Sequence, residues 1–225
     1  MAASQPKQFL ELTGLPILVH SLRAFAAAPR VTAIYVAVRR NEIERVKSQV
    51  DAYGERFGFA GRVFVVEGGD SRQESVVNAL NAINGGRGGD ENDIVLVHDA
   101  VRPLIDAATI ERTIDAVSEH GAAIVGLPAI DTVKQVERTA HGALVTSTIP
   151  REFVVLAQTP QGFRCGLLRR AFAEATADGF VGTDEASVVE RAGHAVAVVP
   201  GSQVNLKITQ PGDLALAEFY LSQRG

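Results

Sequence analysis

The chain has 225 residues, of which 46% are hydrophobic, and this length suits one large α/β domain because single domains of about 200–250 residues are common for such folds. Its formal net charge of −4 argues against a nucleic-acid partner, because 22 Lys and Arg are outnumbered by 26 Asp and Glu and counterion release needs a basic surface. A single cysteine, Cys165, excludes an intrachain disulfide, and no apolar run approaches the roughly 18 residues of a membrane span, so we expect a soluble cytoplasmic protein without a membrane partner.

Amphipathic segments alternate with short apolar runs along most of the chain. Helices are predicted at Pro16–Ala28, from Asn41 to about Tyr53, from Ser71 onward, from the capping residue Asp106 to Gly121, around Leu167–Ala175, after Thr183 and from Pro211 to about Ser222. Strands are predicted at Val31–Val38, Arg62–Glu67, Asp93–Val97, Ala122–Leu127 and Ala195–Val199, and a surface loop at Gly85–Gly89. This alternation predicts a single α/β domain over residues 1–225, with a mostly parallel sheet and helices on both faces.

Polar residues directly follow the apolar run Ile94–Val97. In open α/β sheets, ligands bind beyond the carboxyl ends of the strands. We therefore expect Asp99 and Arg102 to face a metal-bound or phosphorylated substrate. A salt-bridged turn explains this acid and base equally well when the pair is considered alone.

A pair of glycines, Gly68-Gly69, ends the preceding apolar run. Ser71 and Glu74 have the spacing of a capping box for the helix that follows. The free N–H groups and the positive dipole end of such a helix suit an anion or the polar edge of a base. Turns of this kind are common in α/β proteins, so the motif supports a ligand site only together with others.

The segment Asp131–Ile149 departs from the alternation. Two runs of alternating polarity are joined through His141-Gly142, which predicts a β-hairpin. An isolated hairpin is only marginally stable in water, so we expect this arm, residues 131–149, to pack on a second subunit of a homodimer. Farther along, Asp184 and Glu185 open a helix, where complementing the helix dipole explains both acids as well as a functional role does.

An ordered set of motifs spans nearly the whole chain. It comprises Pro6-Lys7-Gln8-Phe9, Gly68-Gly69-Asp70-Ser71-Arg72, Val97–Pro103, Asp131-Thr132-Val133-Lys134, Thr159-Pro160-Gln161, Thr183–Ser187 and Asn205–Thr209. With these motifs the chain resembles the 2-C-methyl-D-erythritol 4-phosphate cytidylyltransferase family, which serves isoprenoid precursor synthesis in bacteria and plastids and has a nucleotidyltransferase (Rossmann-like) fold.

The resemblance also implies a first strand and a glycine-rich, arginine-containing loop directly before the Pro6–Phe9 segment. The sequence given begins at Met1 with what matches the last residue of that loop. We therefore expect this strand and loop to be missing here, and we favour a start farther upstream in the complete protein over a natural truncation. The strands that flank the missing one would lack ladder partners.

The reaction implied by the resemblance is the transfer of CMP from CTP to 2-C-methyl-D-erythritol 4-phosphate. A phosphate oxygen of this polyol phosphate would attack the α-phosphorus of CTP in line and expel pyrophosphate, which gives 4-diphosphocytidyl-2-C-methyl-D-erythritol. Catalysis would depend on positioning and on charge stabilisation, with Mg2+ as the cofactor that bridges phosphate oxygens.

The resemblance further implies roles for individual residues. The catalytic residues would be Lys7, which stabilises the transition state, Lys207, which neutralises the attacking phosphate, and Arg151. The nucleotide would be bound by Gly69, Asp70, Arg72 and Ser75, with Arg72 bracing the loop. The polyol phosphate would be bound by Asp99, Arg102, Thr132, Arg151, Thr159 and Lys207, with Thr132 and Arg151 reaching the site of the partner subunit and Asp99 as a candidate Mg2+ ligand. His98 is expected to be a structural hydrogen-bonding residue, because a phosphate monoester is already an anion near neutral pH.

Three alternatives remain open on the sequence. The nearest is a ribitol-5-phosphate cytidylyltransferase, which shares the nucleotide chemistry and differs in the polyol. The second is a nucleotide-binding protein without turnover, which the missing loop would produce. A dinucleotide-dependent oxidoreductase is disfavoured, because no G-x-G-x-x-G motif follows a first strand.

Overall fold

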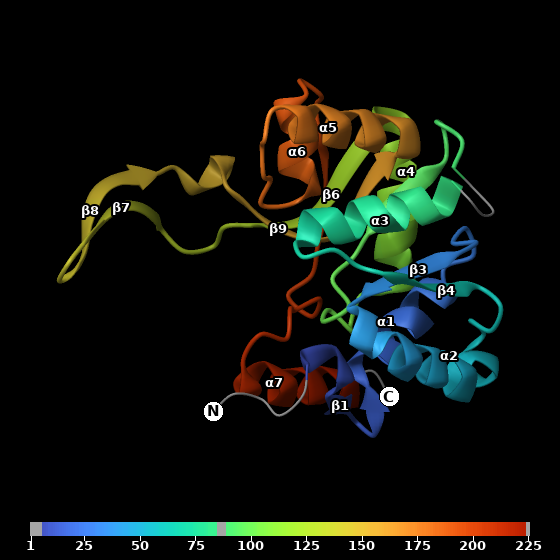
Figure 1. Cartoon of the computed structure of the whole chain (residues 1–225). Helices are drawn as coiled ribbons and strands as arrows, with labels where there is room; N and C mark the ends of the chain where they lie inside the picture. The colour runs from blue at the N-terminus through green and yellow to red at the C-terminus, as the bar shows by residue number, and fades with distance from the viewer. Residues whose placement is uncertain (1–5, 85–88, 224–225) are drawn as a thin grey trace.

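A computed structural model describes residues 6–84 and 89–223 (Figure 1), so the predicted loop at Gly85–Gly89 lies outside the described residues except for Gly89. The helices are α1 (Ile17–Ala26), α2 (Ile43–Phe57), α3 (Arg72–Asn84), α4 (Ala107–His120), α5 (Cys165–Ala177), α6 (Glu185–Arg191) and α7 (Pro211–Ser222), with 3-10 turns at Lys7–Phe9, Arg40–Glu42 and Arg151–Phe153. The strands are β1 (Glu11–Leu12), β2 (Leu15–Pro16), β3 (Ile34–Val38), β4 (Val63–Glu67), β5 (Ile94–Val97), β6 (Ala122–Pro128), β7 (Val133–Thr139), β8 (Gly142–Ile149), β9 (Val155–Arg164) and β10 (Ala197–Pro200). The helices and strands predicted above are present, which confirms the α/β alternation. A strand end was also expected at Lys207, but the segment between β10 and α7 is irregular.

The strands of the body form two principal sheets. β3 pairs with β4 in parallel, and a four-stranded sheet has the order β10–β6–β9–β5. In that sheet β6 and β10 are parallel, whereas β9 runs antiparallel to both β5 and β6. Its remaining strands therefore share one direction, and the sheet is mixed. Among the described strands of these two sheets, β3, β4, β5 and β10 each have a single ladder partner.

β9 is the one strand of the body's two sheets that the sequence did not predict. It contains Pro160, which cannot donate a ladder hydrogen bond and argues against a central strand. The structure resolves this conflict with a register shift: Gln161 pairs with Ile124, but the next pair toward the start of β9 joins Gln158 to Val125. Thr159 and Pro160 are thus looped out of the ladder. Bulges of this kind redirect side chains, and Thr159 is redirected toward the end of β5.

Helices cover both faces of the four-stranded sheet. Alternate residues of β5 belong to different apolar clusters: Val95 and Val97 pack with α3, α5 and α6, whereas Ile94 and Leu96 pack with α4. This period of two is what a strand buried on both faces requires. Cys165 is fully buried in the first of these clusters and is therefore a core residue.

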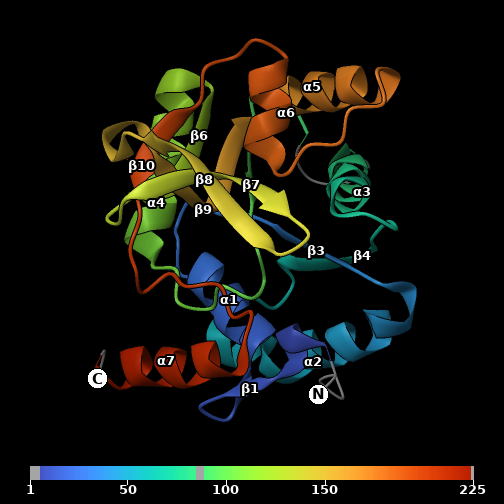
Figure 2. The same cartoon turned by 90° about the vertical axis from the view of Figure 1, so that its left-hand side faces the viewer.

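The predicted hairpin is present as an arm that projects from the body (Figures 1 and 2). Its strands β7 and β8 pair in antiparallel fashion, with a register shift between Gln135 and Val136. All residues of β8 are exposed, including Leu144 at 65% and Val145 at 62%. The arm therefore presents apolar side chains to solvent. Within the described part of the chain, no helix has the length and apolar character to cross a membrane.

Candidate active site

Asp99 lies at the carboxyl end of β5, where three cations converge on its carboxylate. Its Oδ2 atom is 3.0 Å from Lys207 Nζ and 3.5 Å from Arg102 Nε, and its Oδ1 atom is 3.9 Å from Arg72 Nη2. With Glu185, the partner of Arg72, two negative charges thus face three positive charges. The resulting excess of positive charge at a sheet edge suits phosphorylated ligands. The structure brings together four residues that the sequence placed in the site: Asp99, Arg102, Lys207 and Arg72.

The cations determine the protonation state of Asp99. Burial alone would raise the pKa of this carboxyl group, but the hydrogen bond and charge of Lys207, followed by the charges of Arg72 and Arg102, lower it below its ordinary value. Asp99 is therefore ionised at neutral pH. Burial lowers the pKa of Arg102, although Asp99 opposes this shift.

Lys207 reaches Asp99 because its segment runs beside the residues that follow β5. The Ile208 amide donates to Val101 O at 2.9 Å, and Arg102 Nη1 donates to Asn205 O at 2.9 Å. Asn205 is 2% exposed, and its Nδ2 atom donates to Thr159 O at 2.9 Å. Asn205 was quoted from the sequence only as part of a motif, and its role as a brace appears in the structure.

His98 and Thr159 form a hydrogen-bond chain under Asp99. The Asp99 amide donates to Thr159 Oγ1 at 3.1 Å, and the Thr159 hydroxyl lies 2.9 Å from His98 Nδ1. His98 Nε2 is 3.1 Å from Arg102 O, and a carbonyl only accepts, so Nε2 carries the proton and Nδ1 accepts from Thr159. Burial lowers the pKa of His98 to about 4, which keeps the ring neutral. The expected structural role of His98 is confirmed.

The turn at Gly68-Gly69 packs tightly against the first turn of α3. A Cβ atom on Gly69 would lie 2.2 Å from Glu74 Cβ, so only glycine fits there. Gly69 N donates to Ser75 Oγ at 3.0 Å and Asp70 N donates to Glu74 Oε2 at 2.7 Å. The Ser71–Glu74 capping box is present as predicted, with Glu74 N donating to Ser71 Oγ at 3.1 Å and Ser71 N donating to Glu74 Oε2 at 3.2 Å. The Ser75 hydroxyl therefore braces the loop in which a nucleotide contact is predicted.

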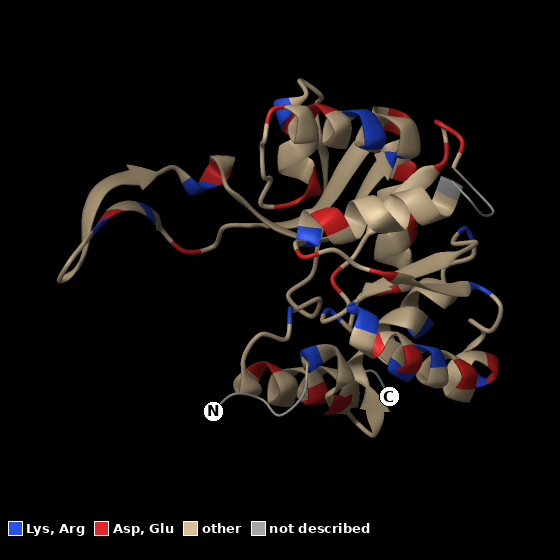
Figure 3. Cartoon of the chain, in the orientation of Figure 1, with Lys and Arg blue, Asp and Glu red and all other residues tan. Residues whose placement is uncertain are grey.

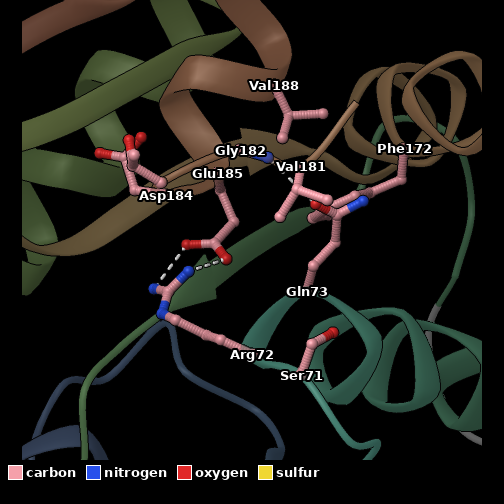
Figure 4. Close-up of a pocket in the computed structure, with 10 residues that line it drawn as sticks. Ser71, Arg72, Gln73, Phe172, Val181, Gly182, Asp184, Glu185 and Val188 are labelled. Atoms are coloured by element: carbon pink, nitrogen blue, oxygen red, sulfur yellow. Dashed lines mark hydrogen bonds and ion pairs between the residues drawn. The ribbon is translucent and has the colours of Figure 1, made fainter. Parts of the chain in front are cut away.

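Arg72 leaves this loop and meets Glu185 at the start of α6 (Figure 4). Arg72 Nη1 donates to Glu185 Oε1, and Nη2 donates to Oε2 at 2.8 Å. Burial alone would lower the pKa of Arg72, but the hydrogen bonds and charge of Glu185 raise it. A small pocket lined by Gln73, Phe172, Val181 and other residues adjoins the pair. The buried partner of Arg72 was not identified from the sequence, where Glu185 was explained equally well by the helix dipole.

The other predicted residues are exposed, and those with a side-chain hydrogen bond make it to groups other than Asp99. Lys7 is exposed, and its Nζ atom donates to Thr209 O, two residues beyond Lys207. Thr132 and Arg151 are exposed at the base of the arm, and Arg151 Nη1 donates to Ile130 O at 2.5 Å. Asp70 is exposed beside the glycine turn. The participation of these residues in the site stays a prediction.

The described residues do not form a protein-built metal site. They contain no group of three or more His, Cys, Asp and Glu placed to hold a metal ion. The oxygens of Asp99 face Lys207, Arg102 and Arg72 instead, and this positive surrounding disfavours a further cation. Any Mg2+ here would have to depend on ligand phosphates for most of its coordination.

Comparison with known proteins identifies the family. The family model of 2-C-methyl-D-erythritol 4-phosphate cytidylyltransferase matches residues 1–223. The chain belongs to this family. A relative of that name from Acidobacterium capsulatum is 69% identical over 220 residues, which cover 98% of this chain and 89% of that protein.

Solved structures of the family share the fold. The 2-C-methyl-D-erythritol 4-phosphate cytidylyltransferase of Francisella tularensis is 34% identical with a TM-score of 0.79, over 96% of this chain and 93% of that one. The enzyme of the same name from Thermus thermophilus is 32% identical with a TM-score of 0.75, over 98% and 96% of the two chains. The predicted nucleotidyltransferase-like fold is thereby confirmed.

Proposed function

We propose that this protein transfers CMP from CTP to 2-C-methyl-D-erythritol 4-phosphate, the activity for which its family is named. The observation that carries the proposal is the convergence of Lys207, Arg102 and Arg72 on Asp99, beside the glycine turn. Attack of one phosphate on another requires that two anions approach each other. A cluster with surplus positive charge reduces that repulsion and stabilises the charge that develops at the α-phosphorus.

Each cation has a proposed task. Lys207 and Arg102 take the attacking phosphate, with Asp99 keeping both side chains in place until the substrate arrives. Arg72 and the glycine turn hold the nucleotide, with Asp70 and Ser75 beside it. Lys7 and Thr159 complete the site, Lys7 by stabilising charge on the leaving pyrophosphate and Thr159 by its hydroxyl.

We propose Mg2+ as the cofactor, delivered as a complex with CTP. Mg2+ retains several waters and is usually bound by one or two carboxylates together with substrate phosphates. Asp99 is the candidate carboxylate for this purpose, but its three cationic neighbours make the phosphates the main ligands. We also propose a cytoplasmic location, where CTP is available.

We further propose a homodimer in which the arm of one subunit covers the site of the other. The exposed apolar side chains of the arm support this, because patches of this kind on a soluble chain mark an interface. Arg151 and Thr132 would then complete the partner's site. If Arg151→Ala and Lys207→Ala subunits are mixed, half of the dimers are mixed and each carries one intact site, so about a quarter of wild-type activity should return. If activity does not return after subunit exchange has been verified, the arm does not complete the site of the partner subunit.

The reaction itself is tested by following pyrophosphate release from CTP with the purified full-length protein. Release with 2-C-methyl-D-erythritol 4-phosphate is expected, whereas ribitol 5-phosphate should support little. Calorimetric CTP binding without any release would instead indicate a binding protein without turnover.

A further inference from the structure

Glu185 is a buried acid whose charge is matched by one arginine. Its side chain is 1% exposed, and both oxygens accept from Arg72, with the Nη2–Oε2 distance at 2.8 Å. A pair that joins two nitrogens to two oxygens fixes the plane of the guanidinium as well as its position. A buried carboxylate is costly without such a partner. Glu185 and Arg72 therefore hold each other in place.

The Glu185 side of the pair is rigidly mounted. Gln161 of β9 is 1% exposed, its Nε2 atom donates to Asp184 Oδ2 at 2.8 Å, and its Oε1 atom accepts from Ala186 N at 3.0 Å. These two hydrogen bonds fasten the first turn of α6 to a central strand on either side of Glu185. Glu185 is thus held in place by hydrogen bonds that join its helix to the sheet.

Arg72 opens α3 directly after the loop of residues 68–71, which is held by local hydrogen bonds and by Gly68 N donating to Val38 O of β3 at 2.8 Å. Asp70 and Ser71 are exposed, and their N–H groups donate to Glu74 within the same segment. Gln73 adds uncharged hydrogen bonds to residues 180 and 182, at 3.5 Å and 3.2 Å. The pair with Glu185 is therefore the charged connection that runs from this loop to the sheet.

Arg72 also faces a second carboxylate. Its Nη2 atom is 2.8 Å from Glu185 Oε2 and 3.9 Å from Asp99 Oδ1. Without the charge of Glu185, the closest remaining anion would be Asp99, and the guanidinium would move toward it. Glu185 thus keeps Arg72 at 3.9 Å from Asp99, outside the closer contacts that Lys207 and Arg102 make with that carboxylate.

We infer that Glu185 is a positioning residue, which fixes Arg72 and the loop of residues 68–71 for binding of the nucleotide. The inference rests on the proposed function, because that function assigns this loop to CTP. Glu185 touches neither substrate, and its effect passes through Arg72. It should therefore govern CTP affinity more than affinity for the polyol phosphate, which retains Lys207 and Arg102.

The test compares Glu185→Gln with Glu190→Gln in the purified full-length protein. Both changes remove one negative charge from α6, but Glu190 is exposed and makes a matched control. Glu185→Gln should raise the KM for CTP about tenfold, the cost of one charge-assisted contact, while kcat at saturating CTP and the KM for the polyol phosphate change less than about threefold. Glu190→Gln should leave all three values at wild-type level.

Melting temperature and calorimetric CTP binding accompany the kinetics. A purely structural ion pair would lower the melting temperature of Glu185→Gln and leave its CTP affinity unchanged below that temperature, which would overturn the inference. If Glu185→Gln does not fold, Glu185→Asp replaces it, and wild-type CTP affinity in that variant would equally overturn the inference. If the wild-type protein binds CTP without releasing pyrophosphate, only the proposed function is wrong, because the CTP affinities of wild type and Glu185→Gln can still be compared by calorimetry. A wild-type protein that does not bind CTP would defeat both.

Discussion

Replacing His98 with glutamine should remove a specific part of the pH dependence of stability. The pKa of His98 falls from 6.5 to about 4 on folding, so between these two pH values His98 is protonated in the unfolded chain and neutral in the folded chain. The part of the free energy of unfolding that depends on a neutral His98 is fully present above pH 6.5 and is lost as the pH falls toward 4. Linkage with these two values gives a loss of about 2 kcal/mol at pH 5. Glutamine offers the same donor and acceptor and does not titrate.

The assay is urea unfolding of wild type and His98→Gln between pH 7 and pH 5. The free energy of unfolding of wild type should fall by about 2 kcal/mol more than that of the variant, equivalent to roughly 4–8 °C in melting temperature for a chain of this size. Carboxylates and His20 titrate in both proteins and cancel in the comparison. Parallel pH profiles for the two proteins would refute the neutral, proton-accepting His98 described for the site.

Three further outcomes are expected. Arg72→Ala should lower the free energy of unfolding, measured in urea, by about 2 kcal/mol. This is less than the roughly 3–5 kcal/mol lost when a fully buried pair is broken, because water reaches Arg72. Adding Glu185→Gln to Arg72→Ala should recover most of the lost stability. Arg151→Ala should raise the KM for 2-C-methyl-D-erythritol 4-phosphate about ten- to a hundredfold and leave the KM for CTP nearly unchanged. An equal loss of CTP affinity would contradict the assignment of Arg151 to the polyol phosphate. Asp99→Asn should be less stable than wild type at pH 7. The pKa of Asp99 is lower in the folded chain than its value of about 3.9 in the unfolded chain, so ionised Asp99 stabilises the fold above that unfolded pKa. The difference in stability between variant and wild type should vanish as the pH falls through the folded pKa.

Local chemistry made much of the fold predictable. The Asp106 side chain accepts from Thr109 N at the start of α4, and Gly121 ends that helix with a φ of 84°, as the sequence indicated. β9 was missed because a proline normally excludes a central strand, and only the partner strand β6 reveals that Pro160 lies in a bulge. A register shift depends on two strands, so one segment alone does not announce it.

In the site too, features that depend on local sequence could be predicted, and features that depend on tertiary contacts could not. The position of Asp99 and Arg102 followed from where an apolar run ends, and the family motif supplied Lys207. The pairing of Arg72 with Glu185 joins residues 113 positions apart, and nothing in either local sequence distinguishes this acid from one that merely complements a helix dipole. Burial separates the two explanations, and burial is a property of the assembled fold.

The composition of the arm has a consequence for the newly made chain. β8 carries no charged side chain from Gly142 to Ile149, and the charges of the hairpin strands lie on β7, at Lys134, Glu137 and Arg138 (Figure 3). A long exposed strand of apolar and hydroxyl residues offers its backbone to other chains, and charged neighbours are the usual protection against such pairing. In the proposed homodimer, an arm that has not yet met its partner is therefore an aggregation hazard. Slow assembly should favour precipitation through β8, and a lysine on its outer face should keep isolated subunits in solution.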